Sequence, residues 1–186
     1  MNASRNGHVE FVEAVARDMK EKGVTWNEKT YNLILTAYAK RKDSRMASRY
    51  LDQMKKELLP LDSHIYTTMI GLQARCGRLK EGFQLLKESS QSPNSLCEWK
   101  TFQTMMARAI DNDDLPQAEA VLEIAKKANV EGIKHLYDSL IQAYACRENI
   151  PRIRALIDQM VESGIFVRPF VLEMLRKYEE RDQLNA

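Results

Sequence analysis

Hydrophobic residues recur in the first third of the chain with the spacing of amphipathic helices. One set falls at i, i+3, i+4 and i+7, on a single helical face: Tyr31, Ile34, Leu35 and Tyr38. A second set repeats this pattern: Ala47, Tyr50, Leu51 and Met54. Between the two sets lies a polar run in which Asp43 can cap the second helix, and Pro60 ends the segment. Residues 28–62 therefore predict a hairpin of two helices.

The same pattern returns three more times. Aromatic residues recur at steps of 35, 36 and 35 residues: Tyr31, Tyr66, Phe102 and Tyr137. Two further columns keep these steps: Ala47, Gly82, Ala118 and Ile153, and Leu51, Leu86, Leu122 and Ile157. Self-similarity at a fixed period of this size is the signature of a solenoid. We therefore expect four repeats, with helices over about 29–41, 45–57, 64–75, 79–90, 99–110, 115–128, 134–146 and 150–163.

Two polar stretches interrupt the repeats. Residues 89–95 break the end of the second repeat, where we expect a bulge or local flexibility. Three carboxylates lie together at Asp111, Asp113 and Asp114 and raise the possibility of a metal site. A helix cap at Asp114 explains them better, because Asn149 occupies the same place one repeat later.

Short motifs match a known family. Thr30-Tyr31-Asn32 opens the first full repeat, and Met-Lys-x-x-Gly at 19–23 and Met-x-x-x-Gly at 160–164 resemble one characteristic ending. The column Leu35, Ile70, Met106 and Ile141 is bulky, where a tetratricopeptide unit of 34 residues would carry Gly. Over about residues 5–175 the chain resembles the pentatricopeptide repeat family. This resemblance implies an all-α, right-handed α-solenoid of helical hairpins.

The repeat phase also divides the chain. The four repeats cover 28–62, 63–98, 99–133 and 134–168, while 169–186 reads as a C-terminal capping helix. Residues 1–27 read as a partial repeat, in which 1–6 end a first helix and the second helix runs from about His8 to Lys22. We expect the apolar face of residues 9–19 to be covered by another protein subunit or by residues preceding Met1.

Composition adds limits rather than a function. The 186 residues are 44% hydrophobic and 29% charged, and no apolar run approaches the length that spans a membrane. The net charge of +2 permits RNA binding without arguing for it. No nucleophile, phosphate loop or metal-ligand spacing is recognisable, so we expect neither enzymatic activity nor a metal or other cofactor.

The resemblance implies an RNA-facing surface on the first helices. In this family the fifth and last residues of each repeat choose a base, and the second packs against it. The fifth places are Asn32, Thr67, Gln103 and Asp138. The last places are Asp62, Cys97 or Glu98, Ile133 and Arg168. Asn32 with Asp62 matches a pairing associated with uracil, although Asp62 can equally cap the next helix, and Asp138 can pair with Arg168.

The second places carry polar, potentially cationic groups: Lys29, His64, Lys100 and His135. These side chains can meet RNA phosphates, or they can be ordinary solvent-exposed residues at helix starts. Lys40 and Arg75 extend the basic character in the N-terminal half. We thus expect a non-catalytic protein that associates with single-stranded or structured RNA in a mitochondrion or, alternatively, a plastid. It would belong to a larger ribonucleoprotein such as a mitochondrial ribosome. The alternative is a protein–protein adaptor that uses the same groove.

Overall fold

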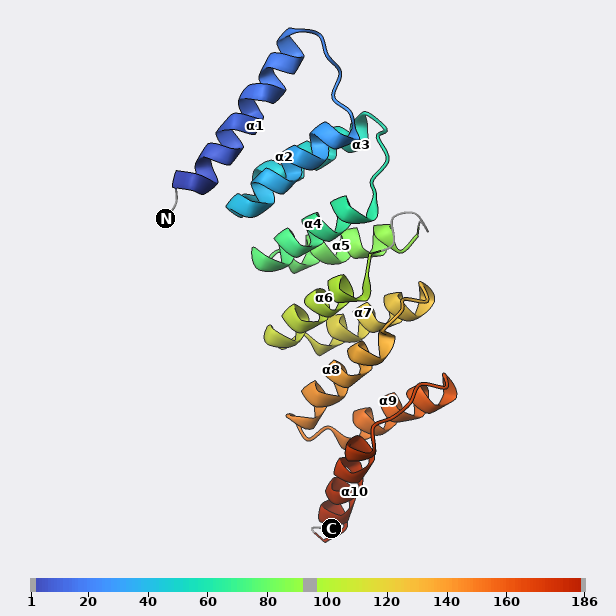
Figure 1. The fold of residues 1–186 in the computed structure, drawn as a ribbon. Helices are drawn as coiled ribbons and strands as arrows, with labels where there is room; N and C mark the ends of the chain where they lie inside the picture. Colours follow the sequence, from blue (N-terminus) through green and yellow to red (C-terminus); the bar gives the residue numbers. More distant parts are fainter. Residues whose placement is uncertain (1–2, 92–96, 185–186) are drawn as a thin grey trace.

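The computed structural model describes residues 3–91 and 97–184, which form ten helices and no strand. The helices follow one another as stacked hairpins, with the two termini at opposite ends (Figure 1). Their bounds are α1 Ala3–Glu21, α2 Glu28–Arg41, α3 Ser44–Lys56, α4 Ser63–Arg75, α5 Leu79–Ser89, α6 Trp99–Asp111, α7 Leu115–Lys127, α8 Ile133–Ala145, α9 Ile150–Glu162 and α10 Pro169–Leu184. The eight helices predicted between residues 28 and 168 are confirmed, each boundary within one residue.

The N-terminal helix differs from the prediction. α1 is one helix from Ala3 to Glu21, so residues 3–6 continue it rather than ending a preceding helix. The repeat count placed a turn before His8, but no proline interrupts the chain there. Carrying the helix through Gly7 costs only about 1 kcal/mol relative to alanine. α1 packs on α2, where Val9 and Ala16 are buried, so this part of the apolar face of residues 9–19 is covered within the chain and not by another subunit or by residues preceding Met1.

Short polar side chains fix where the helices start. Asp43 accepts a hydrogen bond from the backbone N–H of Met46 at 3.0 Å, and Asp114 accepts one from Gln117 at 3.0 Å. Both predicted caps are confirmed. Each carboxylate satisfies a backbone donor that the helix itself leaves without a partner, which is worth about 1 kcal/mol.

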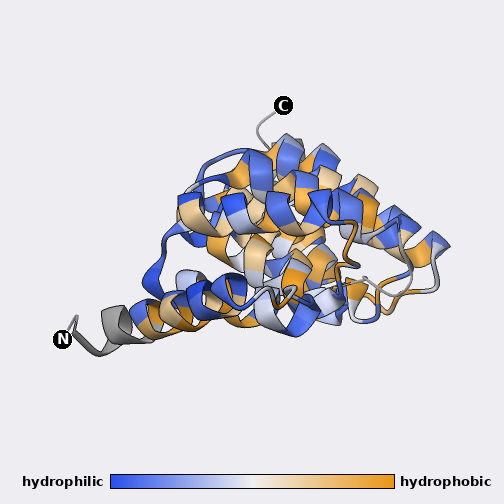
Figure 2. Cartoon of the chain, turned by 90° about the horizontal axis from the view of Figure 1, so that it is seen from above, coloured by the Kyte–Doolittle hydropathy of each residue, from blue (hydrophilic) through white to orange (hydrophobic). Residues whose placement is uncertain are grey.

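The repeating columns form the core. Every member of the Tyr31, Ala47 and Leu51 columns is buried. First helices of successive hairpins pack on one another, α2 on α4, α4 on α6 and α6 on α8, and each hairpin packs its own two helices together. Seen along the stack, each helix alternates hydrophobic and hydrophilic stretches, as amphipathic helices do (Figure 2). The core is thus a continuous layer between hairpins, which confirms the α-solenoid.

Polar contacts recur between neighbouring hairpins. Gln73 on α4 donates to Ser48 on α3 at 2.9 Å, and Tyr144 on α8 donates to Glu119 on α7 at 2.5 Å. Each contact joins a first helix to the second helix of the preceding hairpin, at a separation of 25 residues. Within the described parts of the chain, no helix is both long enough and apolar enough to cross a membrane.

Candidate nucleic-acid interface

A groove of about 520 Å³ lies along the first helices at the N-terminal end. Its lining comes from α1, α2 and α4: Val12, Lys29, Asn32, Leu33, Thr36, Ala37, Lys40 and His64. Four of these residues were candidates from the sequence, and the fold gathers them around one hollow. Lys29, Lys40 and His64 are exposed, while Leu33 adds an apolar side chain that is 65% exposed. The groove therefore combines cationic groups with an apolar surface.

Asn32 and Asp62 have local contacts of their own. The Asn32 carbonyl Oδ1 accepts a hydrogen bond from the Thr36 hydroxyl at 3.4 Å. Asp62 caps α4, where its Oδ1 accepts from the backbone N–H of Ile65 at 2.8 Å. The structural role that the sequence allowed for Asp62 is thus present. The cap uses Oδ1, and an ionised carboxylate retains further acceptor sites, so reading of a base by this pair stays a prediction.

The central repeats offer a more neutral surface. Thr67 is exposed and accepts a hydrogen bond from the Thr101 hydroxyl at 3.4 Å. Gln103 is half-buried on α6 and Lys100 is exposed at its start. Cys97 is only 2% exposed, and burial raises the pKa of its thiol, so it is a core residue rather than a base-contacting one. Of the two possible last places in this repeat, Glu98 is the exposed one.

His135 is held by an aromatic contact that the sequence did not suggest. Its ring stacks on Trp99, with centroids 4.7 Å apart and an angle of 22° between the planes. Gly132, with φ of 78°, precedes α8 and makes room for the indole. A Cβ at this glycine would lie 3.0 Å from Trp99 Cγ. His135 is therefore part of an aromatic pair at the start of α8 as well as a candidate cation.

Arg75 is the last residue of α4, and its side chain lies along the helix beside Gly71. Its Nη1 is 3.6 Å from where a Cβ at Gly71 would stand, so the guanidinium folds back along the helix. The matching places in later repeats are Asp111, which pairs with Arg108 at 3.4 Å, and the exposed Cys146. The basic candidates are therefore concentrated on α2 and α4.

The predicted pairing of Asp138 with Arg168 is present. Arg168 Nη2 lies 2.5 Å from Asp138 Oδ2 and joins α8 to the segment before α10. One residue on from Pro169, Phe170 is 73% exposed. α10 begins one repeat length after α8, so Phe170 occupies the second place of a further unit. Phe170 was not among the sequence candidates, because the series of second places was followed only to His135.

The three neighbouring carboxylates of the third repeat have separate partners. Asp114 caps α7, Asp113 accepts from the Arg147 guanidinium at 3.0 Å from Nε, and Asp111 pairs with Arg108. Among the residues that the structure describes, no group of three His, Cys, Asp or Glu side chains is placed to hold a metal ion. The carboxylates therefore act as a cap and as ion-pair partners.

Solved structures share this fold at low sequence identity. The PPR domain of Arabidopsis thaliana protein-only RNase P 1 in complex with tRNA has a TM-score of 0.68 and 12% identity, covering 95% of this chain and 93% of that one. Nuclear proteinaceous RNase P 2 of A. thaliana has a TM-score of 0.70 at 13% identity, over 95% and 40% of the two chains. PPR10 bound to an 18-nucleotide psaJ RNA element has a TM-score of 0.54 at 19% identity, over 91% and 25%.

Sequence comparisons agree with the repeat pattern. The mitochondrial 15S rRNA processing factor CCM1 of Yarrowia lipolytica is 23% identical over 161 residues, which is 84% of this chain. The chain spans only 21% of that relative's length. The PPR repeat family model matches residues 27–71, and the PPR repeat model matches 64–92 and 135–165, which together exceed half of the chain. The repeats, the fold and these matches show that this chain belongs to the pentatricopeptide repeat family.

Proposed function

We propose that this protein binds RNA in a single-stranded segment, without catalysing a reaction on it, along the face of its first helices. The observation that carries the proposal is the groove of about 520 Å³, where Lys29, Lys40 and His64 surround Asn32. Cationic side chains on a surface of this kind meet phosphates, and phosphate contacts supply sequence-independent affinity.

The apolar part of the groove suits unstacked bases. Leu33 and Val12 offer surfaces for the faces of bases or riboses, while the Asn32 amide offers both a donor and an acceptor to a base edge. Sequence-specific RNA recognition usually uses such splayed-out bases. Because most fifth and last places do not match a base pairing known in the family that the chain resembles, we expect affinity to come mainly from shape and phosphate contacts, to which the exposed Lys100 near Gln103 can contribute.

We further propose a cellular compartment, a class of RNA and an assembly for this binding. The name of the similar CCM1 protein supports a mitochondrial location over a plastid one and a ribosomal RNA as target. A place in a larger ribonucleoprotein, such as a mitochondrial ribosome, is consistent with exposed apolar residues on α1, where Phe11 is 66% and Val15 44% exposed. The same residues favour the alternative function of a protein–protein adaptor.

Salt-dependent RNA binding tests the proposal. Fluorescence anisotropy with labelled single-stranded oligonucleotides would give the dissociation constant at several salt concentrations. The double variant Lys29→Gln with Lys40→Gln removes two positive charges from the groove. It should weaken binding to all sequences alike. It should also flatten the slope of the log binding constant against log salt concentration by about 0.7 for each lost phosphate contact.

The matched control removes the same charge elsewhere. Lys80→Gln with Lys87→Gln neutralises two exposed lysines on α5, a second helix that does not line the groove. This variant should bind RNA with little change in slope. If the parent protein binds no RNA, or if both double variants lose affinity equally, the groove is not an RNA site and the adaptor function is favoured.

A further inference from the structure

Cationic side chains gather on the turns inside the first two full hairpins. They come from the end of α2 and the start of α3, and from the turn before α5 and its first residues: Arg41, Lys42, Arg45, Arg78 and Lys80. All five are exposed. The ends of α2 and α4 that lead into the two turns lie on the same side of the stack (Figure 1). We call these five residues the basic edge.

The two turns are in direct contact. The Cys76 thiol at the end of α4 donates a hydrogen bond to the backbone carbonyl of Lys42 at 3.5 Å. The first helices of the two hairpins, α2 and α4, also pack on one another, and packed helices lie about 8–10 Å apart. The basic edge is therefore one surface that two neighbouring repeats build together, with a row of cations from each.

The cations of the basic edge have no carboxylate partner among the residues that the structure describes. Cations at the following turns do have one. Arg147 donates to Asp113 at 3.0 Å from Nε, and Arg108 lies 3.4 Å from Asp111. Ion pairs of this kind satisfy the charge within the protein, whereas the basic edge leaves its positive charges open to an anion from outside.

Arg78 stands where the other hairpins carry a helix cap. Asp43, Asp114 and Asn149 occupy the matching places, and each accepts a hydrogen bond from a backbone N–H of the helix that follows. Arg78 makes no such bond, and a cation at the start of a helix is repelled by the helix dipole. A local rule that is broken without a structural gain marks a candidate functional residue.

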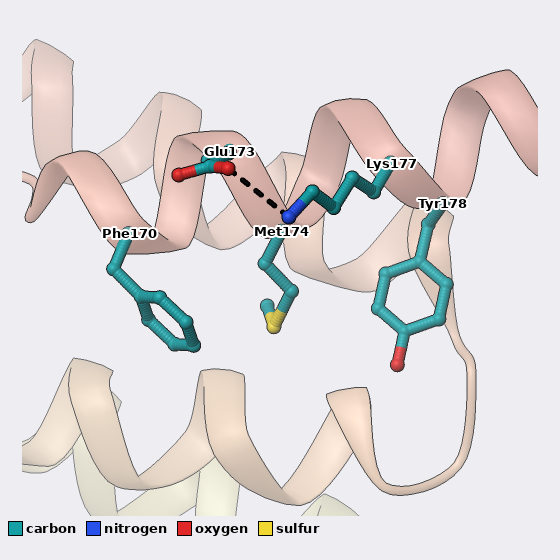
Figure 3. Close-up of a pocket in the computed structure, with 5 residues that line it drawn as sticks. All are labelled: Phe170, Glu173, Met174, Lys177 and Tyr178. Carbon is teal, nitrogen blue, oxygen red and sulfur yellow. Dashed lines mark ion pairs between the residues drawn. The ribbon is translucent and has the colours of Figure 1, made fainter.

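The surface around these cations offers little for a base to stack on. Among the described residues, the large hydrophobic side chains that are exposed all lie outside residues 40–45 and 75–80. By contrast, Phe170, Met174 and Tyr178 of α10 line a hollow of about 440 Å³ between α8 and α10 (Figure 3). A double-stranded RNA stem hides its bases and displays its phosphates. A stem therefore matches the basic edge better than unstacked bases do.

The charge of the turns reverses along the stack. Residues 40–45 carry four cationic side chains and one carboxylate, and residues 75–80 carry three cations and no carboxylate. Residues 108–114 carry one cation and three carboxylates. A polyanion is therefore attracted to the first two turns and repelled at the third. Lys40 lines the groove of the first helices and directly precedes Arg41, so the basic edge continues from that groove.

We propose that the basic edge binds the phosphate backbone of an RNA stem that adjoins the single-stranded segment held in the groove, an inference that rests on the RNA binding proposed above. The groove holds the unpaired nucleotides, and the basic edge contacts phosphates of the stem without reading its sequence. The chain thereby recognises a junction between a stem and a single strand.

Comparison of RNAs with and without a stem tests the inference. A single-stranded segment that the full chain binds would be measured by fluorescence anisotropy alone, with a short hairpin at its 5′ end, and with the same hairpin at its 3′ end. One of the two hairpin RNAs should bind more tightly than the segment alone, because its added phosphates reach the basic edge. Changing the base pairs of the stem at constant length should leave this gain unaltered, since phosphate contacts carry no sequence information.

Variants locate the contacts. Arg45→Gln with Arg78→Gln takes two charges from the basic edge and removes no capping hydrogen bond. Between about 50 and 200 mM salt, the hairpin RNA should lose roughly tenfold less affinity for this variant than for the parent, the factor that two phosphate contacts account for. Its binding of the segment alone should equal that of the parent.

The matched control takes two charges from the opposite ends of second helices. Lys87→Gln with Lys127→Gln changes two exposed lysines near the ends of α5 and α7, away from the turns of the basic edge. This variant should behave like the parent with every RNA. Thermal unfolding of each variant by circular dichroism would show whether a lost gain comes from lost folding.

The outcomes separate this inference from the function on which it rests. Equal binding of the segment with and without a stem, or a gain from the stem that Arg45→Gln with Arg78→Gln retains in full, would overturn the stem site and leave the groove intact. Absence of binding to all of these RNAs would overturn both. Vesicles that contain an anionic phospholipid offer phosphates from another source. Vesicle binding that the variant loses, without any gain from a stem, would assign the basic edge to a membrane surface and overturn the inference.

Discussion

The Tyr144 hydroxyl donates a hydrogen bond to Glu119 Oε1 at 2.5 Å, which ties α8 to the second helix of the preceding hairpin. The same carboxylate accepts from Arg152 Nε at 2.8 Å, so Glu119 joins three helices. Tyr38 makes the equivalent contact with Glu13, also across 25 residues. A tyrosine–carboxylate link therefore sets the register between hairpins near both ends of the stack.

Removing this link should lower stability by a measurable amount. Tyr144→Phe deletes the hydroxyl but keeps the ring, and it should cost about 1–3 kcal/mol, since the acceptor is charged. Urea unfolding followed by circular dichroism would give the free energy of unfolding. Because Glu119 also holds Arg152, Glu119→Gln should weaken both contacts, and a double-mutant cycle should show coupling between Tyr144 and Glu119. Additive losses would mean that the hydrogen bond contributes nothing.

The buried tyrosines predict loss of stability at high pH. Burial, and then the hydrogen bond to Glu119, raise the pKa of Tyr144; burial also raises the pKa of Tyr66 and Tyr137. Unfolded tyrosine ionises near pH 10, so the unfolded state loses protons first. The contribution of these tyrosines to the free energy of unfolding should be constant below about pH 10 and should fall as the pH rises further. Tyr144→Phe should show a shallower fall than the parent.

Truncating a side chain of the buried repeat columns should lower the stability of the protein by a large amount. Leu51 and Leu122 are 4% and 2% exposed between hairpins, so replacing either with alanine should cost about 2–5 kcal/mol. Val161→Ala provides the control, because Val161 is 64% exposed and its truncation should change stability by less than about 0.5 kcal/mol. A loss for Leu51 as small as that for Val161 would place the apolar face elsewhere.

Gly132 should tolerate a side chain less well than another glycine of similar backbone geometry. Gly132 and Gly164 have φ of 78° and 67°, so alanine strains both positions. Only at Gly132 would the new Cβ also press on Trp99, at 3.0 Å; at Gly164 it would meet nothing within 4 Å. Both variants should lose about 1 kcal/mol from strain, and Gly132→Ala should lose more. Equal losses would show that the Trp99–His135 stack adjusts freely.

Asn32 carries the prediction about base choice in the N-terminal groove. If Asn32 and Asp62 read a base together, Asn32→Thr should shift the preference at one nucleotide from uracil towards a purine in a binding-site selection. The cap that Asp62 provides to α4 should remain, since Asn32 does not contribute to it. An unaltered selection profile with RNA binding retained would mean that Asn32 and Asp62 have structural roles here.

The sequence alone determined the eight helices between residues 28 and 168, their starts and the face that each buries. The 35-residue columns identified Leu51 and Leu122 as core, and Asp43 and Asp114 were recognisable as caps. These features depend on residues within one or two turns of each other, so helical periodicity and short-range hydrogen bonding are enough to predict them.

Only the tertiary structure decided which surfaces the hairpins create between them. The joining of Lys29 and Lys40 to His64 around one groove, the stacking of His135 on Trp99, and the hollow between α8 and α10 all combine residues from different units. The burial of Val9 and Ala16 against α2 likewise follows from the tertiary structure. Periodicity assigns a residue to a helix face, but the distance between faces is set by how side chains of neighbouring hairpins fill the space between them.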